Sequence, residues 1–149
     1  MISIIQRVTE ASVSVNTRVI GSIPQGIMAL MAVEKDDTEK EGIQMLARIL
    51  NYRIFADQDE KMNRSLSDIK GGLLIVPQFT LAADTEKGNR PSFHRAASPE
   101  QGRLLFNYLQ HHAKEIYPRV QFGEFGANMQ VSLVNDGPVT FTLKTKRSK

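Results

Sequence analysis

Asn135-Asp136-Gly137-Pro138-Val139-Thr140 joins two segments of alternating apolar and polar residues, 129–134 and 139–143. This junction predicts the tip of a hairpin or a tight crossing between two strands. Gly137 has no Cβ, so a ligand can approach its backbone closely, and Pro138 has a fixed φ and allows a cis peptide bond before it. The corner would present carbonyl oxygens on a stiff frame, although the same residues also make an ordinary turn.

A second short stretch, Val76-Pro77-Gln78-Phe79-Thr80, follows an apolar run that predicts a buried strand. Because proline cannot donate to a sheet ladder, Pro77 predicts the point where this strand ends. Thr80 has a hydroxyl, but no neighbour in its motif could act as a base, so it could equally bond to nearby backbone. Gln78 could orient a water or a ribose hydroxyl, or satisfy a buried carbonyl.

The remaining pattern predicts one mixed α/β domain, in keeping with a length of 149 residues. The apolar run 27–33 predicts a central strand covered on both faces. Thr38 and Glu41 have the spacing of a capping box, and apolar residues follow at helical intervals. Ser98 and Gln101 repeat this pattern. We therefore expect two principal helices, a loop over residues 82–95, and further strands at 2–8, 11–15, 18–23, 52–55 and 73–76.

Composition excludes several classes of protein. The chain has no cysteine, which rules out disulfides and cysteine-ligated metals. No apolar run could span a bilayer and the N-terminus lacks a signal-peptide pattern, so we expect a cytoplasmic protein with no membrane partner. The formal charge is +3, but four cations lie in residues 144–149 and the rest of the chain carries −1. We expect a domain over residues 1–143 and a basic C-terminal tail over 144–149 that is disordered or meets RNA phosphates.

Familiar catalytic motifs are absent from the sequence. It contains no Gly-x-Ser-x-Gly, no phosphate-binding loop and no zincin motif. Its three histidines are His94, in the predicted loop, and the adjacent pair His111 and His112. Helical neighbours point about 100° apart, so this pair would need further ligands to hold a metal. We expect no metal and no cofactor.

Several blocks of sequence, in order over nearly the whole chain, carry a resemblance to a known family. They are Ile5-Gln6-Arg7-Val8, Val33-Glu34-Lys35-Asp36-Asp37, Asn51-Tyr52-Arg53-Ile54-Phe55, Lys61-Met62-Asn63, Gln78-Phe79-Thr80-Leu81-Ala82-Ala83-Asp84-Thr85, Arg90-Pro91-Ser92-Phe93, Met129-Gln130-Val131-Ser132-Leu133 and Asn135 to Thr140. The chain resembles the D-aminoacyl-tRNA deacylases, editing enzymes also called D-tyrosyl-tRNA deacylases. Residues 1–143 would form the deacylase domain.

The resemblance implies a fold and a mechanism. The fold would be a curved, barrel-like and mostly antiparallel sheet with two principal helices, assembled as a homodimer with the active site at the subunit interface. The 3′-terminal adenosine of the tRNA would bind backbone groups and an apolar pocket, and its own 2′-hydroxyl would help water attack the aminoacyl ester. Gln78 would orient the water, and the backbone N–H groups near Phe79 and Thr80 would stabilise the oxyanion.

The resemblance also implies how one hand of amino acid is selected. The Gly137-Pro138 carbonyls, in the family joined by a cis bond and inserted into the partner subunit's pocket, would reject an L side chain. A D side chain, or the glycine of a glycyl-tRNA mischarged on alanine tRNA, would be accepted. Pro77, Val139 and Thr140 would also contact substrate. Arg7 and Met129 match family positions near this corner and are expected to hold it in place.

One residue departs from the family pattern. Most members have serine where this chain has Pro77, which lacks both the hydroxyl and the N–H of serine. A sister branch in animals also has this proline, but it has alanine in place of Phe79 and a trans Gly-Pro bond. Because Phe79 and Gly-Pro-Val-Thr are retained, we predict a deacylase and leave the geometry of the bond open. The alternatives are a binding module that keeps the tRNA-end pocket without hydrolysis, and a metal-dependent hydrolase using His111 and His112.

Overall fold

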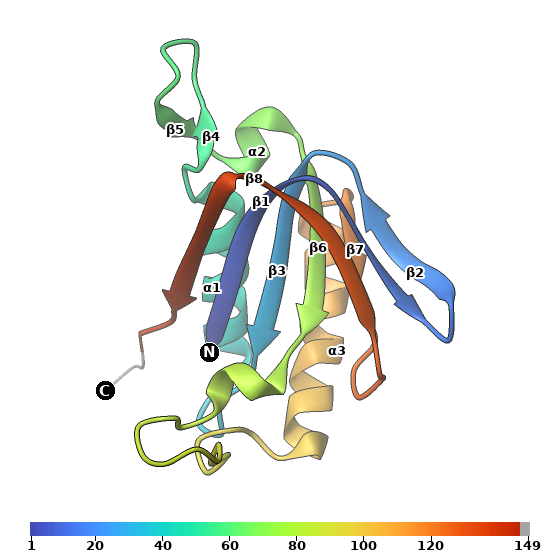
Figure 1. The fold of residues 1–149 in the computed structure, drawn as a ribbon, viewed down its shortest axis with the longest axis vertical. Coiled ribbons are helices and arrows are strands. Elements are labelled where there is room, and N and C mark those ends of the chain that lie inside the picture. The colour runs from blue at the N-terminus through green and yellow to red at the C-terminus, as the bar shows by residue number, and fades with distance from the viewer. Residues whose placement is uncertain (147–149) are drawn as a thin grey trace.

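Strand β1 organises the sheet because its two halves have different neighbours on one edge. The computed structural model describes residues 1–146 (Figure 1). Residues 2–8 of β1 pair antiparallel with β3, whereas residues 11–15 pair with β2. The other edge of β1 pairs with β8. This change of partner curves the sheet, and β2 also contacts β6 and β7, so that the sheet is nearly closed.

The chain forms a six-stranded sheet and a small two-stranded sheet. The order in the larger sheet is β2-β1-β3-β6-β7, with β8 on the other edge of β1. The pairings of β1 are antiparallel, and those of β6 with β3 and β7 are parallel. The elements are β1 (Ile2–Val15), β2 (Arg18–Ile23), β3 (Gly26–Ala32), α1 (Glu39–Asn51), β4 (Phe55–Ala56), β5 (Met62–Arg64), α2 (Leu66–Ile69), β6 (Gly72–Pro77), the 3-10 helix η1 (Phe79–Ala82), α3 (Pro99–Ile116), β7 (Val120–Phe122) and β8 (Gln130–Lys144).

The predicted mixed α/β fold with a barrel-like, mostly antiparallel sheet and two principal helices is confirmed. Helices α1 and α3 lie on one face of the sheet, and α2 adds a single turn between β5 and β6 (Figure 1). Within residues 1–146, no helix is both long and apolar enough to cross a membrane.

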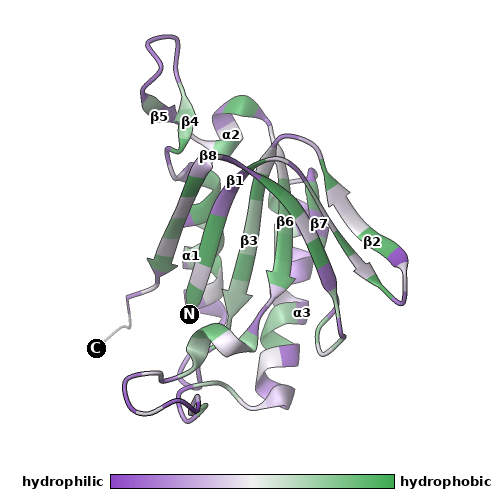
Figure 2. Ribbon diagram, in the orientation of Figure 1, coloured by the Kyte–Doolittle hydropathy of each residue, from purple (hydrophilic) through white to green (hydrophobic). Residues whose placement is uncertain are grey.

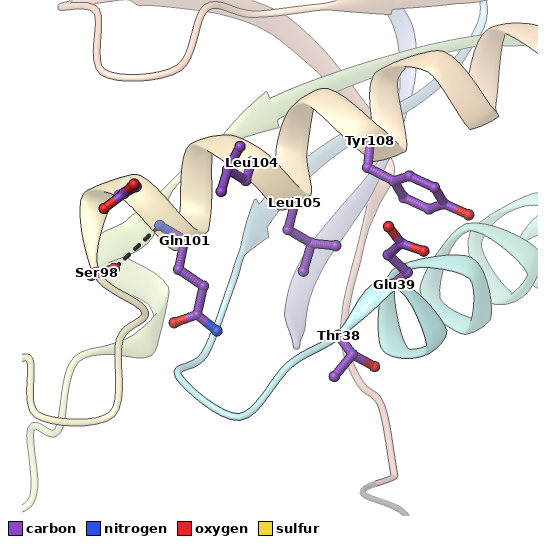
Figure 3. A pocket seen from close by; sticks show the side chains of 8 residues that line it. Thr38, Glu39, Ser98, Gln101, Leu104, Leu105 and Tyr108 are labelled. Carbon is purple, nitrogen blue, oxygen red and sulfur yellow. Dashed lines mark hydrogen bonds between the residues drawn. The ribbon is translucent and has the colours of Figure 1, made fainter.

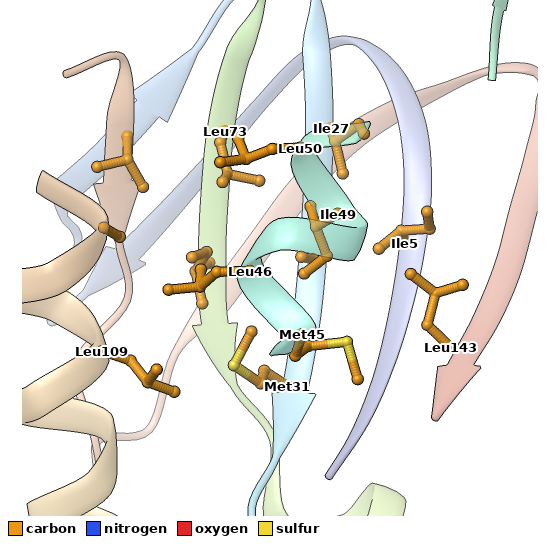
Figure 4. Packing of buried hydrophobic residues seen from close by; sticks show 14 of the residues in the cluster. Ile5, Ile27, Met31, Met45, Leu46, Ile49, Leu50, Leu73, Leu109 and Leu143 are labelled. Atoms are coloured by element: carbon orange, nitrogen blue, oxygen red, sulfur yellow. The ribbon is translucent and has the colours of Figure 1, made fainter. Parts of the chain in front are cut away.

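Two hydrophobic clusters, one on each face of the sheet, form the core. The apolar strands β1, β3 and β6 run through the middle of the molecule, with polar loops at its ends (Figure 2). Alternate residues of β3 and β6 enter different clusters, as expected for strands covered on both faces. The cluster on the helical side includes Ile5, Ile27, Met31, Met45, Leu46, Ile49, Leu50, Leu73, Leu109 and Leu143 (Figure 4). The other includes Val8, Ala11, Val13, Ile23, Met28, Leu74 and Val76.

Both predicted helix starts are present, but only one has a complete capping box. At α1, the Thr38 hydroxyl accepts from the Lys40 N–H (3.3 Å), and the Glu41 carboxylate accepts from the Thr38 N–H (2.7 Å). At α3, Ser98 Oγ accepts from the Gln101 N–H at 3.2 Å (Figure 3). The side chain of Gln101 instead donates to the Lys35 carbonyl at 2.8 Å. That contact ties the first turn of α3 to the loop before α1.

Some predicted boundaries were wrong. The segments 2–8 and 11–15 belong to one strand, β1, because β8 pairs along both. The expected strand 52–55 is reduced to Phe55–Ala56, since Tyr52 is the C-cap of α1. Strand β8 ends at Lys144, which pairs with Ile2, one residue past the predicted domain end at Leu143. Residues 147–149 of the predicted tail lie outside the described residues.

The parallel strands β3 and β6 pack too closely at their start to leave room for a side chain at Gly26. A Cβ on Gly26 would lie 1.8 Å from the Gly72 carbonyl oxygen, which is backbone and cannot turn aside. Gly26→Ala should therefore lower the free energy of unfolding by about 3 kcal/mol. Gly88→Ala is the control, because nothing lies within 4 Å of its added Cβ and only its φ of 69° opposes the change. Its cost should be about 1 kcal/mol. Equal losses in urea titrations would contradict this account.

The capping box of α1 should make stability depend on pH. The hydroxyl and the N–H of Thr38 bond to the Glu41 carboxylate and hold its pKa below the ordinary 4.5. The contribution of the ionised Glu41 carboxylate to the free energy of unfolding is therefore complete above pH 4.5. It is lost as pH falls through the lower pKa of the folded state. Glu41→Gln should lower the free energy of unfolding at pH 7 by about 1 kcal/mol, and its difference from the wild type should shrink as pH falls below 4.5. Glu39→Gln, in the same turn, should not reproduce this pH dependence in denaturant titrations.

Candidate active site

An apolar cavity lies where β3 and β6 end. Its volume is about 540 Å³, and it is bounded by the ends of these strands, η1, the first turn of α3 and the loop between β7 and β8. No side chain that lines it is ionisable, within the part of the chain that the structure describes. The lining residues are Met31, Val33, Pro77, Gln78, Phe79, Phe93, Ala96, Ala97, Ser98, Pro99, Gly102, Phe106, Phe125 and Gly126.

The segment from Pro77 to Thr80 forms one wall of this cavity. Pro77 is the last residue of β6, as predicted, and pairs with Met31 of β3. The Gln78 N–H donates to the Met31 carbonyl at 2.8 Å, and η1 then begins at Phe79. N–H groups in the first turn of a helix have no acceptor within it. Phe79 and Thr80 therefore carry two neighbouring donors at the edge of an apolar cavity.

The side chains of this segment offer no obvious base. The amide of Gln78 donates to the hydroxyl of Thr80, and both lie near the surface. An amide cannot take a proton from a hydroxyl, so this bond orients Thr80 without activating it. Phe79 is 59% exposed, and its ring centroid lies 5.3 Å from that of Phe93.

The Gly137-Pro138 corner is a bulge within β8, not the tip of a hairpin. Both flanking segments pair with the same strand, since Asn135 lies opposite Val8 and Thr140 lies opposite Gln6. Four residues of β8 therefore oppose Arg7 alone. The prediction of two separate strands was wrong because β8 uses β1, and not itself, as its pairing partner. The peptide bond that the sequence left open is cis.

The Arg7 side chain, on the strand opposite the bulge, fixes the backbone of the corner. Its guanidinium donates to the Asp136 carbonyl (3.1 Å) and to the Ile54 carbonyl (2.8 Å). Its Nε also lies 3.6 Å from the Asp136 carboxylate. Gly137 has a φ of 128°, and a Cβ there would lie 3.0 Å from Arg7 Nη2. Gly137 and Pro138 themselves are exposed.

Two further bonds brace the corner from its flanks. The Asn135 side chain accepts from the Val139 N–H at 3.0 Å and donates to the Thr140 hydroxyl at 2.8 Å. Val139 is buried in the helical-side cluster, so the backbone returns to the core directly after Pro138. The corner is thus a stiff, outward-facing projection.

The end of β6 with η1, which border the cavity, and the bend of β8, which holds the corner, lie at opposite ends of the sheet (Figure 1). Arg7 pairs with Ile27, which pairs with Leu73, and Pro77 follows four residues later on β6. At 3.3 Å per residue this is about 13 Å along the strands, and three strand spacings add about 14 Å sideways. The two motifs that the sequence singles out therefore do not meet within one chain.

A family model described as D-Tyr-tRNA(Tyr) deacylase matches residues 4–144 of this chain. The chain belongs to this family. It is 56% identical over 146 residues to the D-aminoacyl-tRNA deacylase of Herminiimonas arsenicoxydans, with 98% of each chain covered. It is 55% identical over 143 residues to that of Pseudoalteromonas atlantica, covering 96% of this chain and 99% of the relative.

Solved structures share the fold. A protein named c-Myc DNA Unwinding Element Binding Protein superposes with a TM-score of 0.93 at 39% identity, covering 99% of this chain and all of that one. A structure described as a probable eukaryotic D-amino acid tRNA deacylase superposes with a TM-score of 0.83 at 19% identity, covering 95% of this chain and 97% of that one. The latter supports the fold alone.

The site residues inferred from the family resemblance divide between the two ends of the molecule. Pro77, Gln78 and Phe79 line the cavity, and Thr80 follows Phe79 in η1. Arg7, Val139 and Thr140 lie with Gly137 and Pro138 at the corner. Met129, expected to hold the corner, lies at the cavity end, where its sulfur accepts from the Glu124 N–H at 3.4 Å.

Sequence reasoning missed much of the cavity lining. Phe93, Phe106 and Phe125 line it, but the sequence marks them only as a loop residue, a helix core residue and a residue between two loop glycines. Their shared apolar character was the only available signal. It carries no information about which of them face the same space.

The histidines lie in two places, with His94 in the loop before α3 and the adjacent His111 and His112 within α3. Across residues 1–146 there is no group of three or more His, Asp or Glu side chains able to hold a metal. The ring of His112 stacks on Tyr108 with centroids 6.1 Å apart. A second hollow of about 420 Å³ lies between the first turns of α1 and α3 (Figure 3), but none of the predicted site residues lines it.

Proposed function

We propose that the chain is a D-aminoacyl-tRNA deacylase that hydrolyses the ester between a D-amino acid and the 3′ end of tRNA, in the cytoplasm. The observation that carries the proposal is a cavity lined by no ionisable side chain and bordered by the start of η1 at Phe79, in a chain matched over residues 4–144 by the deacylase family. An apolar cavity with a few well-placed donors suits a ligand that must be oriented more than activated.

In the proposed mechanism the substrate supplies its own catalytic hydroxyl. The terminal adenosine occupies the cavity, and its 2′-hydroxyl helps a water molecule, oriented by Gln78, to attack the ester carbonyl carbon. The carbonyl oxygen becomes an oxyanion that accepts from the N–H groups of Phe79 and Thr80. The bond between the carbonyl carbon and the 3′ oxygen then breaks, the 3′ oxygen takes a proton, and the amino acid leaves as its carboxylate. One such donor contributes about 3 kcal/mol to transition-state stabilisation.

Selection of the D form is assigned to the corner of a second subunit. Because corner and cavity lie at opposite ends of one chain, a homodimer with the active site at its interface would bring the Gly137 and Pro138 carbonyls of one chain to the cavity of the other. An L side chain would collide with this stiff projection, while a D side chain would point away. Glycine has no side chain to reject, so glycyl-tRNA mischarged on alanine tRNA would also be a substrate.

Hydrolysis can be tested with a pair of substitutions at one position. Thr80→Ala removes the hydroxyl but keeps the N–H, whereas Thr80→Pro removes the N–H and is tolerated sterically in the first turn of a helix. Release from D-aminoacyl-tRNA and glycyl-tRNA should be fast, with the L form spared and EDTA without effect. Thr80→Ala should retain rates within about tenfold, and Thr80→Pro should lose about 100-fold or more at an unchanged melting temperature.

Other results would favour one of the alternative functions over a deacylase that acts through backbone donors. No release from any substrate would favour the binding module, in which Pro77 has removed the chemistry. Loss of release in EDTA would favour a metal-dependent hydrolase. A loss with Thr80→Ala as large as that with Thr80→Pro would make the hydroxyl the catalytic group.

The shared site can be tested by mixing two inactive variants. Gly137→Ala adds a Cβ, at a φ of 128°, to the corner that would enter the partner's cavity, and should therefore obstruct that cavity. Gly102→Leu fills the cavity itself, where an added Cβ already lies 3.0 Å from the Phe125 ring. In an equal mixture half of the dimers are mixed, and each mixed dimer has one intact site. Activity should return to about one quarter of the wild-type value after subunit exchange. A mixture that stays inactive, with both variants folded by circular dichroism, would contradict a site built from two chains.

A further inference from the structure

Two exposed aromatic rings stand at the mouth of the cavity. Phe79 is 59% exposed and Phe93 is 40% exposed, and their centroids lie 5.3 Å apart with planes tilted by 51°. Both also line the cavity, so each ring has one side toward it and another toward solvent. Most large apolar residues of this chain are buried in the two clusters, and a paired exposure beside a cavity is typical of a binding surface.

The loop that presents Phe93 is tied down on both sides. Asp84 and Ser92 exchange two backbone hydrogen bonds, of 2.7 and 3.1 Å, which close the loop before Phe93. After it, the Ala96 N–H donates to the Phe93 carbonyl at 3.1 Å, and the Ala97 N–H donates to the Val33 carbonyl at 3.1 Å. The ring is therefore held on a defined backbone, which reduces the entropy lost when a partner binds.

The same loop carries three cations and two acids. Lys87 and Arg90 are exposed, as is Glu86, and Arg95 lies 3.7 Å from the Asp84 carboxylate. Aromatic rings interleaved with cations are the combination used to bind single-stranded nucleic acid, since the rings stack bases and the cations attract phosphates.

We propose that Phe93, with the edge of Phe79, stacks the base of the nucleotide that precedes the terminal adenosine of the tRNA. This inference rests on the proposed function, which places the terminal adenosine and its ester in the cavity. A cavity of about 540 Å³ suits a ligand of the size of the terminal adenosine with its aminoacyl ester. The rest of the RNA must then extend out of the cavity past Phe79 and Phe93 at its mouth. The base before the terminal adenosine then meets Phe93, and the phosphates that follow run toward Lys87 and Arg90.

The test compares a long and a truncated substrate. The long one is D-aminoacyl-tRNA, and the short one is D-aminoacyl-adenosine, which ends at the terminal nucleoside. Phe93→Ala should raise KM for the tRNA substrate about tenfold more than it raises KM for the short substrate, with kcat little changed, because the short substrate lacks the stacked base. Phe93→Tyr should behave as the wild type with both. Phe125→Leu, inside the cavity, is the matched control and should impair both substrates.

A binding readout separates this inference from the proposed function. A short RNA with the tRNA 3′ sequence and 2-aminopurine as its second-to-last base should lose fluorescence on binding the wild type, because stacking quenches it, and should lose much less with Phe93→Ala. Quenching that needs Phe93, without hydrolysis of any substrate, would keep the stacking site and overturn the proposed function.

Three results would overturn the stacking site. The first is hydrolysis by the wild type with the same quenching by Phe93→Ala. The second is an equal loss with both substrates in Phe93→Ala, which would mean that the ring only shapes the cavity. The third is a change of sedimentation coefficient in Phe93→Ala that parallels its loss of activity, which would mean that a second copy of the chain covers the ring.

Discussion

The pairing of β8 with β1, interrupted opposite Arg7, is the constraint on which the rest of the structure depends. On both sides of the interruption the two strands keep an antiparallel ladder, and both ladders bury apolar side chains. Of the four unpaired residues, Gly137 and Pro138 project from the sheet into solvent, whereas Val139 returns to the core. The Arg7 guanidinium donates hydrogen bonds to the carbonyls of Asp136 and Ile54. The side chain of β1 opposite the interruption therefore stabilises the projecting part of β8.

This pairing also separates the parts of the site. The corner lies at the end of the sheet where the β1 and β8 ladders break, and the cavity lies where the parallel strands β3 and β6 end. Ligand sites at the carboxyl ends of parallel strands are common because loops and helix starts converge there. In this chain they contribute apolar walls, and under the proposed mechanism the chemistry would come from backbone donors and from the substrate. Pro77 fits the end of β6, because a residue at the end of a strand need not donate an N–H to the ladder.

The fold itself leaves function undecided. A structure of the same fold at 39% identity is named as a DNA-unwinding-element binding protein, and the relatives at 55% and 56% identity are named as deacylases. A shared backbone can serve more than one activity, so the assignment has to come from the cavity, its donors and the motifs at its edge. The family match over residues 4–144 and the identity to named deacylases place this chain with the deacylases.

The sequence by itself determined the family, the single mixed α/β domain, the buried strands, the helix starts at Thr38 and Ser98, and the end of β6 at Pro77. These are local signals: periodicity, capping spacing and the missing N–H of proline act within a few residues. Only the tertiary structure decided that the corner is a bulge in one strand, that it lies far from the cavity of its own chain, and that Phe93 stands at the cavity mouth. Each of these depends on which distant segment a strand pairs with, and that choice is set by burial over the whole sheet, which no short stretch of sequence contains.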